Sequence, residues 1–161
     1  DRFTGARPKN DKEFLFLAQH YGLPTRLLDW TYNPLIALYF ACCSNFDKDG
    51  VVYHSCPFSM MVFDEDKDDI LSFPAITLLV PNMTDVRYKN QNGIFVLYPE
   101  PWKENFEFIY AKYIIPVQYK QNILSKLEKI GITRSFIMPS LDSLCKDIVD
   151  IHDLRYPYAI K

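Results

Sequence analysis

Residues 19–41 have the sequence QHYGLPTRLLDWTYNPLIALYFA, and this stretch decides what the rest of the fold must accommodate. Its first thirteen positions contain an imidazole, a guanidinium, a carboxylate, an indole and two threonine hydroxyls. An apolar segment, residues 34–41, follows almost directly. A segment of this kind is either the polar lining of a site or a buried polar network that fixes one loop.

Helices are expected on both sides of this polar stretch. Residues 11–21 place apolar side chains at helical spacing, with Asp11 in the capping position. Asn33 followed by Pro34 is typical of a helix start, because the missing N–H of proline is harmless in the first turn. Residues 35–43 are apolar on every face, which predicts a helix that is buried on all sides.

The remainder of the chain alternates short strands with helices, which indicates the α+β class. Residues 87–98 alternate at period two, which predicts a strand with two cations, an amide and Gly93 on one face. We expect one domain over residues 1–161, with bent mixed or antiparallel sheets flanked by helices. The other expected strands are residues 51–53, 76–80, 112–117 and 135–138, and the other expected helices are residues 121–130 and 139–148, the last with its apolar residues on one face.

Size and composition exclude several classes of protein. A chain of 161 residues fits one domain, and a net charge of −2 gives no broad footprint for duplex nucleic acid or an anionic membrane. The four cysteines form no CxxC and no metal-ligand spacing, which favours a reduced, cytoplasmic setting without a metal. We also expect no membrane segment and no signal peptide. Because the chain begins with Asp1, we expect a processed product or a fragment.

The stretch at residues 19–41 closely resembles the signature of the FRG domain family. Residues 87–95 (RxxxQxGxF) are similar to the second motif of that family, and residues 127–141 are similar to its closing segment. The resemblance covers about residues 14–148. The Phe-Arg-Gly tripeptide that names the family is absent, which leaves open whether an N-terminal strand and an arginine of the site are missing.

A second and more distant resemblance, to ADP-ribosyltransferase folds, concerns the order of elements. Residues 27–31 lead into the apolar helix, residues 50–53 follow as a strand, and Gln91 later precedes another strand. Trp30 and Thr31 stand where those folds have a serine-rich step, and Gln91 is nearest to their acidic position. This resemblance implies an ADP-ribosyltransferase-like fold and NAD as a co-substrate.

The resemblance implies a set of site residues. Cleavage of the bond between nicotinamide and ribose builds positive charge on the sugar, which Asp29 would face, while Arg26 would bind the pyrophosphate bidentately. Gln91 can hold a hydroxyl but cannot supply a negative charge, so catalysis would depend on Asp29. The candidate catalytic residues are Asp29, Gln91 and His20, and the candidate cofactor-binding residues are Arg26, Thr25, Trp30, Thr31, Tyr21, Arg87 and Gly93.

Structural roles for the same residues stay open at this point. Arg26 and Asp29 lie three positions apart and are able to pair with each other and with loose backbone groups. Trp30 fits a place in the core, and His20 fits a helix C-terminus, where it would interact with carbonyls. Residues 87–91 also fit a solvated strand face.

Two functions follow from this set. The first is an NAD-using ADP-ribosyltransferase or NAD glycohydrolase, as in a toxin or defence effector, with a protein or nucleic-acid acceptor. The second is a module that binds a nucleotide or nucleic acid without chemistry, since cations and rings on the expected strand at residues 87–98 suit single strands. A nuclease or other hydrolase ranks last, because no suitable motif occurs in a sensible context. Both leading hypotheses require residues 19–31 and 87–95 to line a common cleft, and both leave the oligomeric state open.

Overall fold

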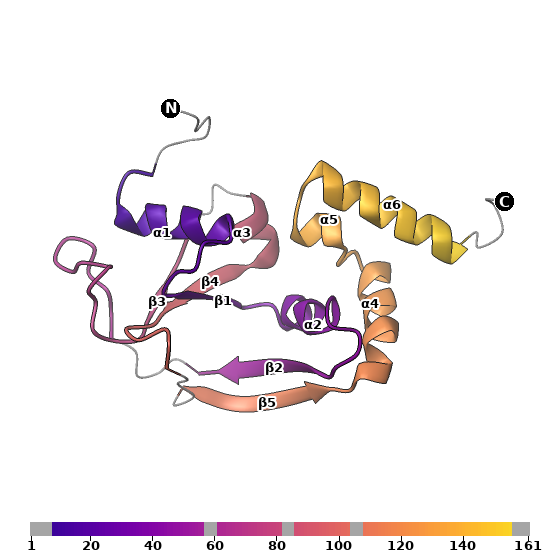
Figure 1. Ribbon diagram of the computed structural model, residues 1–161, viewed down its shortest axis with the longest axis horizontal. Helices are drawn as coiled ribbons and strands as arrows, with labels where there is room; N and C mark the ends of the chain where they lie inside the picture. Colours follow the sequence, from indigo (N-terminus) through magenta and orange to yellow (C-terminus); the bar gives the residue numbers. More distant parts are fainter. Residues whose placement is uncertain (1–7, 57–60, 82–85, 104–107, 156–161) are drawn as a thin grey trace.

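The computed structural model describes residues 8–56, 61–81, 86–103 and 108–155, which form an α+β fold as expected (Figure 1). No helix in these ranges is long and apolar enough to cross a membrane. The helices are α1 (Asp11–His20), α2 (Pro34–Cys42), α3 (Val86–Gln91), α4 (Lys120–Lys129), α5 (Arg134–Ile137) and α6 (Leu141–Arg155), with a 3₁₀ turn at Val117–Tyr119. The strands are β1 (Leu27–Thr31), β2 (Gly50–Ser55), β3 (Thr77–Leu79), β4 (Gly93–Leu97) and β5 (Ile109–Ile115).

The strands form two separate sheets, and every pairing between the described strands is antiparallel. The larger sheet has the order β1-β4-β3, with Leu27 opposite Leu97 and Thr31 opposite Gly93. Strands β2 and β5 form the second sheet. All five residues of β4 are buried, as befits the central strand of a sheet with both neighbours in place. The expected antiparallel pairing is therefore confirmed, and no mixed sheet is present among the described strands.

Helix α1 covers one face of the three-stranded sheet (Figure 1). The ring of Phe16 stacks on Phe95 of β4, with centroids 4.7 Å apart. The Tyr88 hydroxyl of α3 donates to the Phe16 carbonyl at 3.1 Å. The helix begins at Asp11 as the sequence predicted, but its cap lies one residue earlier, because the side chain of Asn10, and not that of Asp11, accepts the free N–H of Glu13.

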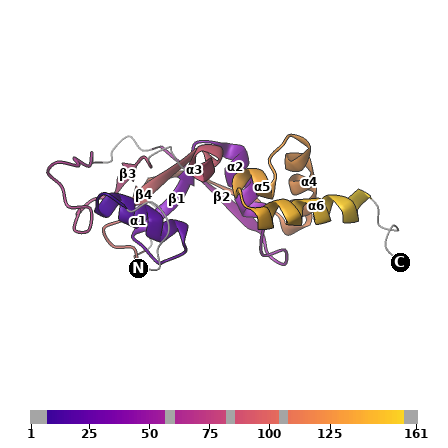
Figure 2. The same ribbon diagram turned by 90° about the horizontal axis from the view of Figure 1, so that it is seen from above.

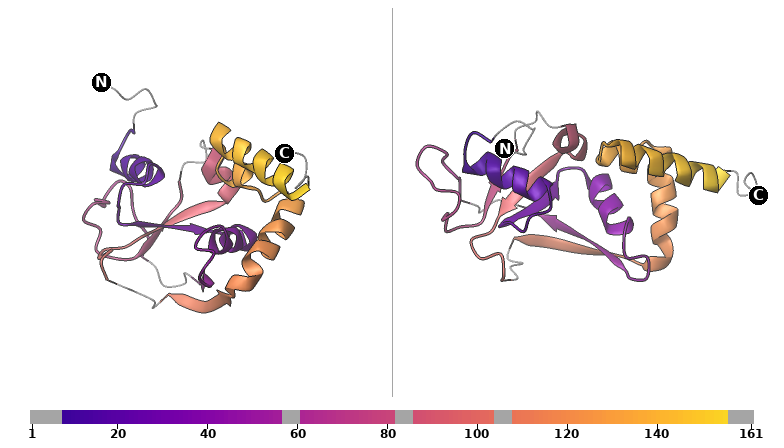
Figure 3. Two further views of the ribbon diagram at one scale, coloured as in Figure 1. Left: turned by 45° about the vertical axis from the view of Figure 1, so that its right-hand side comes forward. Right: turned by 45° about the horizontal axis from the view of Figure 1, so that its top comes forward.

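Helix α2 lies between the three-stranded sheet and α4, as the view from above shows (Figure 2). It contributes to a second core, whose buried members are Ile36, Tyr39, Leu127, Ile132 and Ile137. The expected cap is confirmed, since the Asn33 side chain accepts from the N–H of Leu35 at 3.0 Å and Pro34 lies in the first turn. Burial on all sides was a wrong prediction. The helix packs against α4 and β2 (Figure 3). Leu35 and Phe40 nevertheless remain 39% and 38% exposed.

Two segments that the sequence predicts as strands are partly or wholly helical. Residues 86–91 form α3, and extended backbone starts only at Gly93, because Asn92 turns the chain with a φ of +46°. The alternation at residues 87–91 therefore lies on a helix and not on a strand face. Residues 134–137 form α5, whose first turn is capped by the Thr133 side chain, which accepts from the N–H of Phe136 at 3.1 Å.

Helix α6 packs against the body through its polar side. Ser143 is buried, and Asp147 accepts from the N–H of Ser135 at the start of α5, at 2.7 Å. The apolar face predicted for this helix points outward instead. Leu141, Leu144 and Ile148 are 77%, 47% and 58% exposed, because capping α5 decides how α6 is rotated.

A buried lysine joins the start of α4 to the turn after α2. The side chain of Lys120, at the start of α4, is only 2% exposed. Its ammonium donates to the carbonyls of Ser44 at 2.6 Å, Asn45 at 3.0 Å and Lys48 at 3.2 Å. These carbonyls follow the end of α2, so one cation donates to three acceptors that the helix and its turn leave open.

We predict that Lys120→Met lowers the free energy of unfolding by about 2–4 kcal/mol, because a buried carbonyl without a donor keeps its full desolvation penalty. Chemical denaturation followed by circular dichroism measures this. Lys126→Met, at an exposed position of the same helix, is the control and should change stability by less than about 0.5 kcal/mol. Equal stability of the two variants would contradict a supporting role for Lys120.

A second prediction concerns Gly50, where β2 passes the end of α2. A Cβ at this position would lie 2.2 Å from the carbonyl oxygen of Ala41, which is backbone and cannot move aside. Gly50→Ala should therefore destabilise the protein by about 2 kcal/mol or more. Gly93→Ala is the matched control, because its Cβ would find ordinary contact distances of 3.6 Å and beyond. Thermal unfolding of the two variants side by side measures the difference.

Candidate functional site

An exposed carboxylate, that of Asp29, lies on the edge strand β1 and is held by a short polar chain. The Gln19 amide, in the last turns of α1, donates to Asp29 Oδ2 at 3.0 Å. The Thr25 hydroxyl donates to Gln19 Oε1 at 2.7 Å and accepts from the N–H of Leu27 at 3.0 Å. The backbone of β1 thus orients Thr25, Thr25 orients Gln19, and Gln19 orients the carboxylate.

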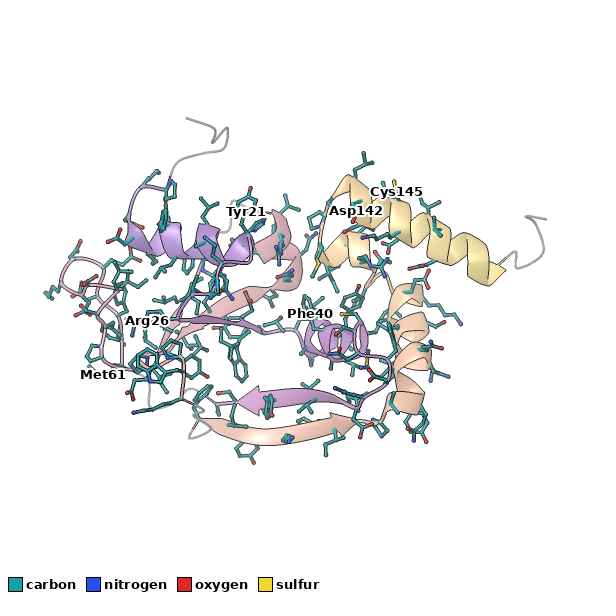
Figure 4. The ribbon with its side chains drawn as sticks, in the orientation of Figure 1. Tyr21, Arg26, Phe40, Met61, Asp142 and Cys145 are labelled. Carbon is teal, nitrogen blue, oxygen red and sulfur yellow. The ribbon has the colours of Figure 1, made fainter. Side chains whose placement is uncertain are left out.

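The Arg26 side chain binds loose backbone groups, which is one of the structural roles that the sequence left open. Its guanidinium donates to the carbonyls of Tyr98 at 2.9 Å, Ile70 at 3.2 Å and Phe73 at 2.8 Å, and also to that of Leu71. Among the described residues it makes no ion pair with Asp29. Burial lowers the pKa of the guanidinium, and the nearby Asp69 partly opposes this. Figure 4 shows Arg26 beneath α1, beside the segment that it binds.

Thr31 and Gln91 meet at a junction of β1, α3 and α5. The Thr31 hydroxyl donates to the Gln91 carbonyl at 2.6 Å and accepts from the N–H of Asn33 at 3.0 Å. The Gln91 amide donates to the Ile137 carbonyl at 3.1 Å, and the amide of Asn90 donates to Phe136 at 2.7 Å. The side chains of Asn90 and Gln91 therefore join α3 to the end of α5.

The other candidates lie around the end of α1 and on the sheet. The His20 ring lies 5.0 Å from that of Tyr21 and 6.0 Å from that of Tyr88, and the His20 carbonyl accepts from Arg87 at 3.4 Å. Tyr21 is 71% exposed (Figure 4). Gly93 is buried in β4.

The Trp30 side chain faces the other side of β1. Its ring lies 5.7 Å from that of Phe108, just before β5, and its indole N–H is buried without a hydrogen-bond partner among the described residues. The tryptophan is half-buried between β1 and the residue that precedes β5.

The two polar stretches therefore do come together, but a cavity among the described residues lies elsewhere. The strand pairing of β1 with β4 and the contacts of His20 and Thr31 join residues 19–31 to residues 87–95. A cavity of about 430 Å³ lies between α2, α4 and α6, and none of the ten candidate residues lines it. Within the described ranges, no three or more His, Cys, Asp or Glu side chains are grouped to hold a metal ion.

Sequence reasoning missed the residues of this cavity. Its walls include Glu128 of α4, Asp147 of α6 and Arg134, and its floor includes Tyr39 and Cys43 of α2. The only local signal is the helical spacing of polar residues on α4 and α6. Nothing in the sequence indicates that these two faces oppose each other across the end of α2.

The geometry defines a small α+β domain with an oriented carboxylate on one edge strand and, between helices, a cavity lined by apolar and charged residues. A model described as the FRG domain matches residues 2–50. This match supports the resemblance to the FRG domain family that the stretch at residues 19–41 predicted. The match covers neither residues 87–95 nor residues 127–141. It does not support the resemblance to ADP-ribosyltransferase folds. No curated protein and no solved structure matches the chain.

We predict that Arg26→Lys lowers the free energy of unfolding by about 2–4 kcal/mol, because an ammonium cannot reproduce the planar fork that reaches four carbonyls. Limited proteolysis should cut the segment at residues 61–76 faster than in the parent protein. Lys67→Met, at an exposed position of the same segment, is the control and should leave the cleavage pattern unchanged. Unaltered stability and cleavage in Arg26→Lys would show that the guanidinium does not hold this segment.

Proposed function

We propose that the protein is an NAD-using enzyme of the ADP-ribosyltransferase or NAD glycohydrolase type, with Asp29 as its catalytic carboxylate. One observation supports this above all: Asp29 is exposed on an edge strand, and Gln19 and Thr25 fix its orientation. An exposed carboxylate whose only role is solubility needs no hydrogen bonds that fix its orientation. An oriented negative charge is what a reaction that develops positive charge on a ribose requires.

In this proposal the carboxylate faces the C1′ atom of the nicotinamide ribose. As the glycosidic bond breaks, its electron pair leaves with nicotinamide, and the positive charge on the sugar develops opposite Asp29. The ring of Tyr21, exposed at the end of α1, offers a face on which nicotinamide or adenine stacks. The ADP-ribose then passes to water or to a protein or nucleic-acid acceptor, as in a cytoplasmic toxin or defence effector.

The roles of Arg26 and Gln91 change in this proposal. Both side chains donate to backbone carbonyls, so they support β1 and α3 and do not bind NAD directly. Of the three candidate catalytic residues, Asp29 and His20 remain beside the ligand. Gln91 supports the site through Thr31, whose hydroxyl donates to its carbonyl.

The alternative is a module that binds a nucleotide without chemistry. The engagement of Arg26 and Gln91 in structural contacts favours it, since neither side chain is then available to bind the pyrophosphate or a ribose hydroxyl of NAD. The structure removes the argument for single-stranded nucleic acid, because residues 87–91 form a helix and β4 is buried.

Incubation with NAD and measurement of free nicotinamide tests the proposal. Asp29→Asn keeps the shape of the side chain and removes its charge, so release should fall by about 100-fold or more. Gln19→Leu, which frees the carboxylate to rotate, should lower release by about tenfold. Asp47→Asn, an exposed carboxylate in the turn before β2, is the control.

The outcomes separate the two functions. Saturable NAD binding without nicotinamide release would favour the binding module. Release that is equal in the parent protein and in Asp29→Asn would exclude Asp29 as the catalytic group.

A further inference from the structure

We propose that the groove between α2, α4 and α6 is a binding site for a compact organic cation: an apolar or aromatic body that ends in an amine, amidine or guanidine. The groove is separate from the surface around Asp29, and no role in the proposed NAD chemistry is assigned to it. Its volume of about 430 Å³ lies at the lower end of the range for small-molecule sites.

The floor of the groove is apolar and uncharged. It includes Tyr39 and Cys43 of α2, together with Leu124 and Ile132. Burial raises the pKa of the Tyr39 phenol and that of the Cys43 thiol, so both are neutral at neutral pH. Such a floor takes the ring or alkyl chain of a ligand and contributes two polarisable groups without charge.

The walls of the groove are acidic. Glu128, Asp147 and Asp150 supply three carboxylates, and Arg134 supplies one guanidinium. Arg134 pairs with Asp150 at 3.1 Å. Burial alone would lower the pKa of Arg134, but Asp150, Tyr39 and Asp147 more than offset this and raise it. The guanidinium is therefore committed to the protein.

Two negative charges are left on the walls. Asp147 accepts a backbone N–H from Ser135, which is neutral and leaves its charge in place. Glu128 makes no ion pair with any of the described residues. A cation that enters the groove meets both carboxylates across an apolar floor, where less water screens the attraction than on an open surface. An anion or a dinucleotide would meet repulsion instead.

The same chemistry can come from a free amine or from an arginine or lysine side chain of another protein. Two probes distinguish these sources: benzamidine as the free cation, and the blocked tripeptide acetyl-Gly-Arg-Gly-amide as the side chain. Benzamide has nearly the shape of benzamidine and no charge, so it measures the contribution of the floor alone.

The experiment is titration of the isotope-labelled protein with each probe, followed by the shifts of backbone amide signals. We expect saturable shifts centred on Ser125, Ile132 and Thr133, with benzamidine bound about tenfold or more tightly than benzamide. Glu128→Gln should weaken benzamidine binding by about fivefold to tenfold. Asp142→Asn, on α6 but outside the groove (Figure 4), should not change it.

A second variant guards against a trivial loss of structure. Ser125→Phe fills the groove from α4 and should abolish the shifts while the melting temperature stays close to that of the parent. Tighter binding of benzamidine than of the peptide assigns the site to a free amine, and the reverse assigns it to a protein side chain. The proposal is overturned if no probe gives saturable shifts in the groove, if benzamide binds as well as benzamidine, or if Glu128→Gln binds benzamidine unchanged.

Discussion

The packing of residues 70–73 against the three-stranded sheet depends on the hydrogen bonds from Arg26 to four backbone carbonyls. Three of these carbonyls belong to residues 70–73, in a segment without regular secondary structure, and the fourth belongs to Tyr98 just after β4. The N–H of Tyr98 in turn donates to the Arg26 carbonyl at 2.9 Å. Irregular backbone packed on a sheet must find donors for its carbonyls, and one guanidinium supplies them here.

The same solution recurs elsewhere in the chain. Lys120 supplies donors to the turn after α2, and the amides of Asn90 and Gln91 supply them to the last residues of α5. Two small sheets and short helices leave many backbone groups outside regular ladders. Long polar side chains then complete the hydrogen bonding. This explains why most polar side chains of residues 19–31 form hydrogen bonds within the protein. The exposed carboxylate of Asp29 is the clearest exception.

The sequence predicted elements better than it predicted contacts. Asn33 and Pro34 marked the start of α2 because capping and proline geometry act locally. The alternation at residues 87–98 misled because Asn92, in a left-handed conformation, divides it into a helix and a strand. Alternation over five residues does not distinguish a short helix from a strand.

Contacts between distant segments were beyond local reasoning. Arg26 was expected to meet a phosphate, Asp29 or loose backbone groups, but nothing near it in sequence identifies the carbonyls, more than forty positions away, that it binds. The groove was missed for the same reason, because its floor and its two walls come from α2, α4 and α6.

Helix α2 connects the two regions that we propose as functional. At its first turn, Asn33 caps the helix and donates its backbone N–H to Thr31 on β1, two positions beyond Asp29. At its other end, Cys43 lies in the floor of the groove and Lys120 fixes the carbonyls that follow. A nine-residue helix anchored at both ends behaves as a rigid rod. A ligand that shifts the floor of the groove would therefore have to move α2 as a unit, against the contacts at Thr31. Because those contacts also join α3 and α5, such a movement would have to break or shift the hydrogen bonds around Thr31, two positions from Asp29.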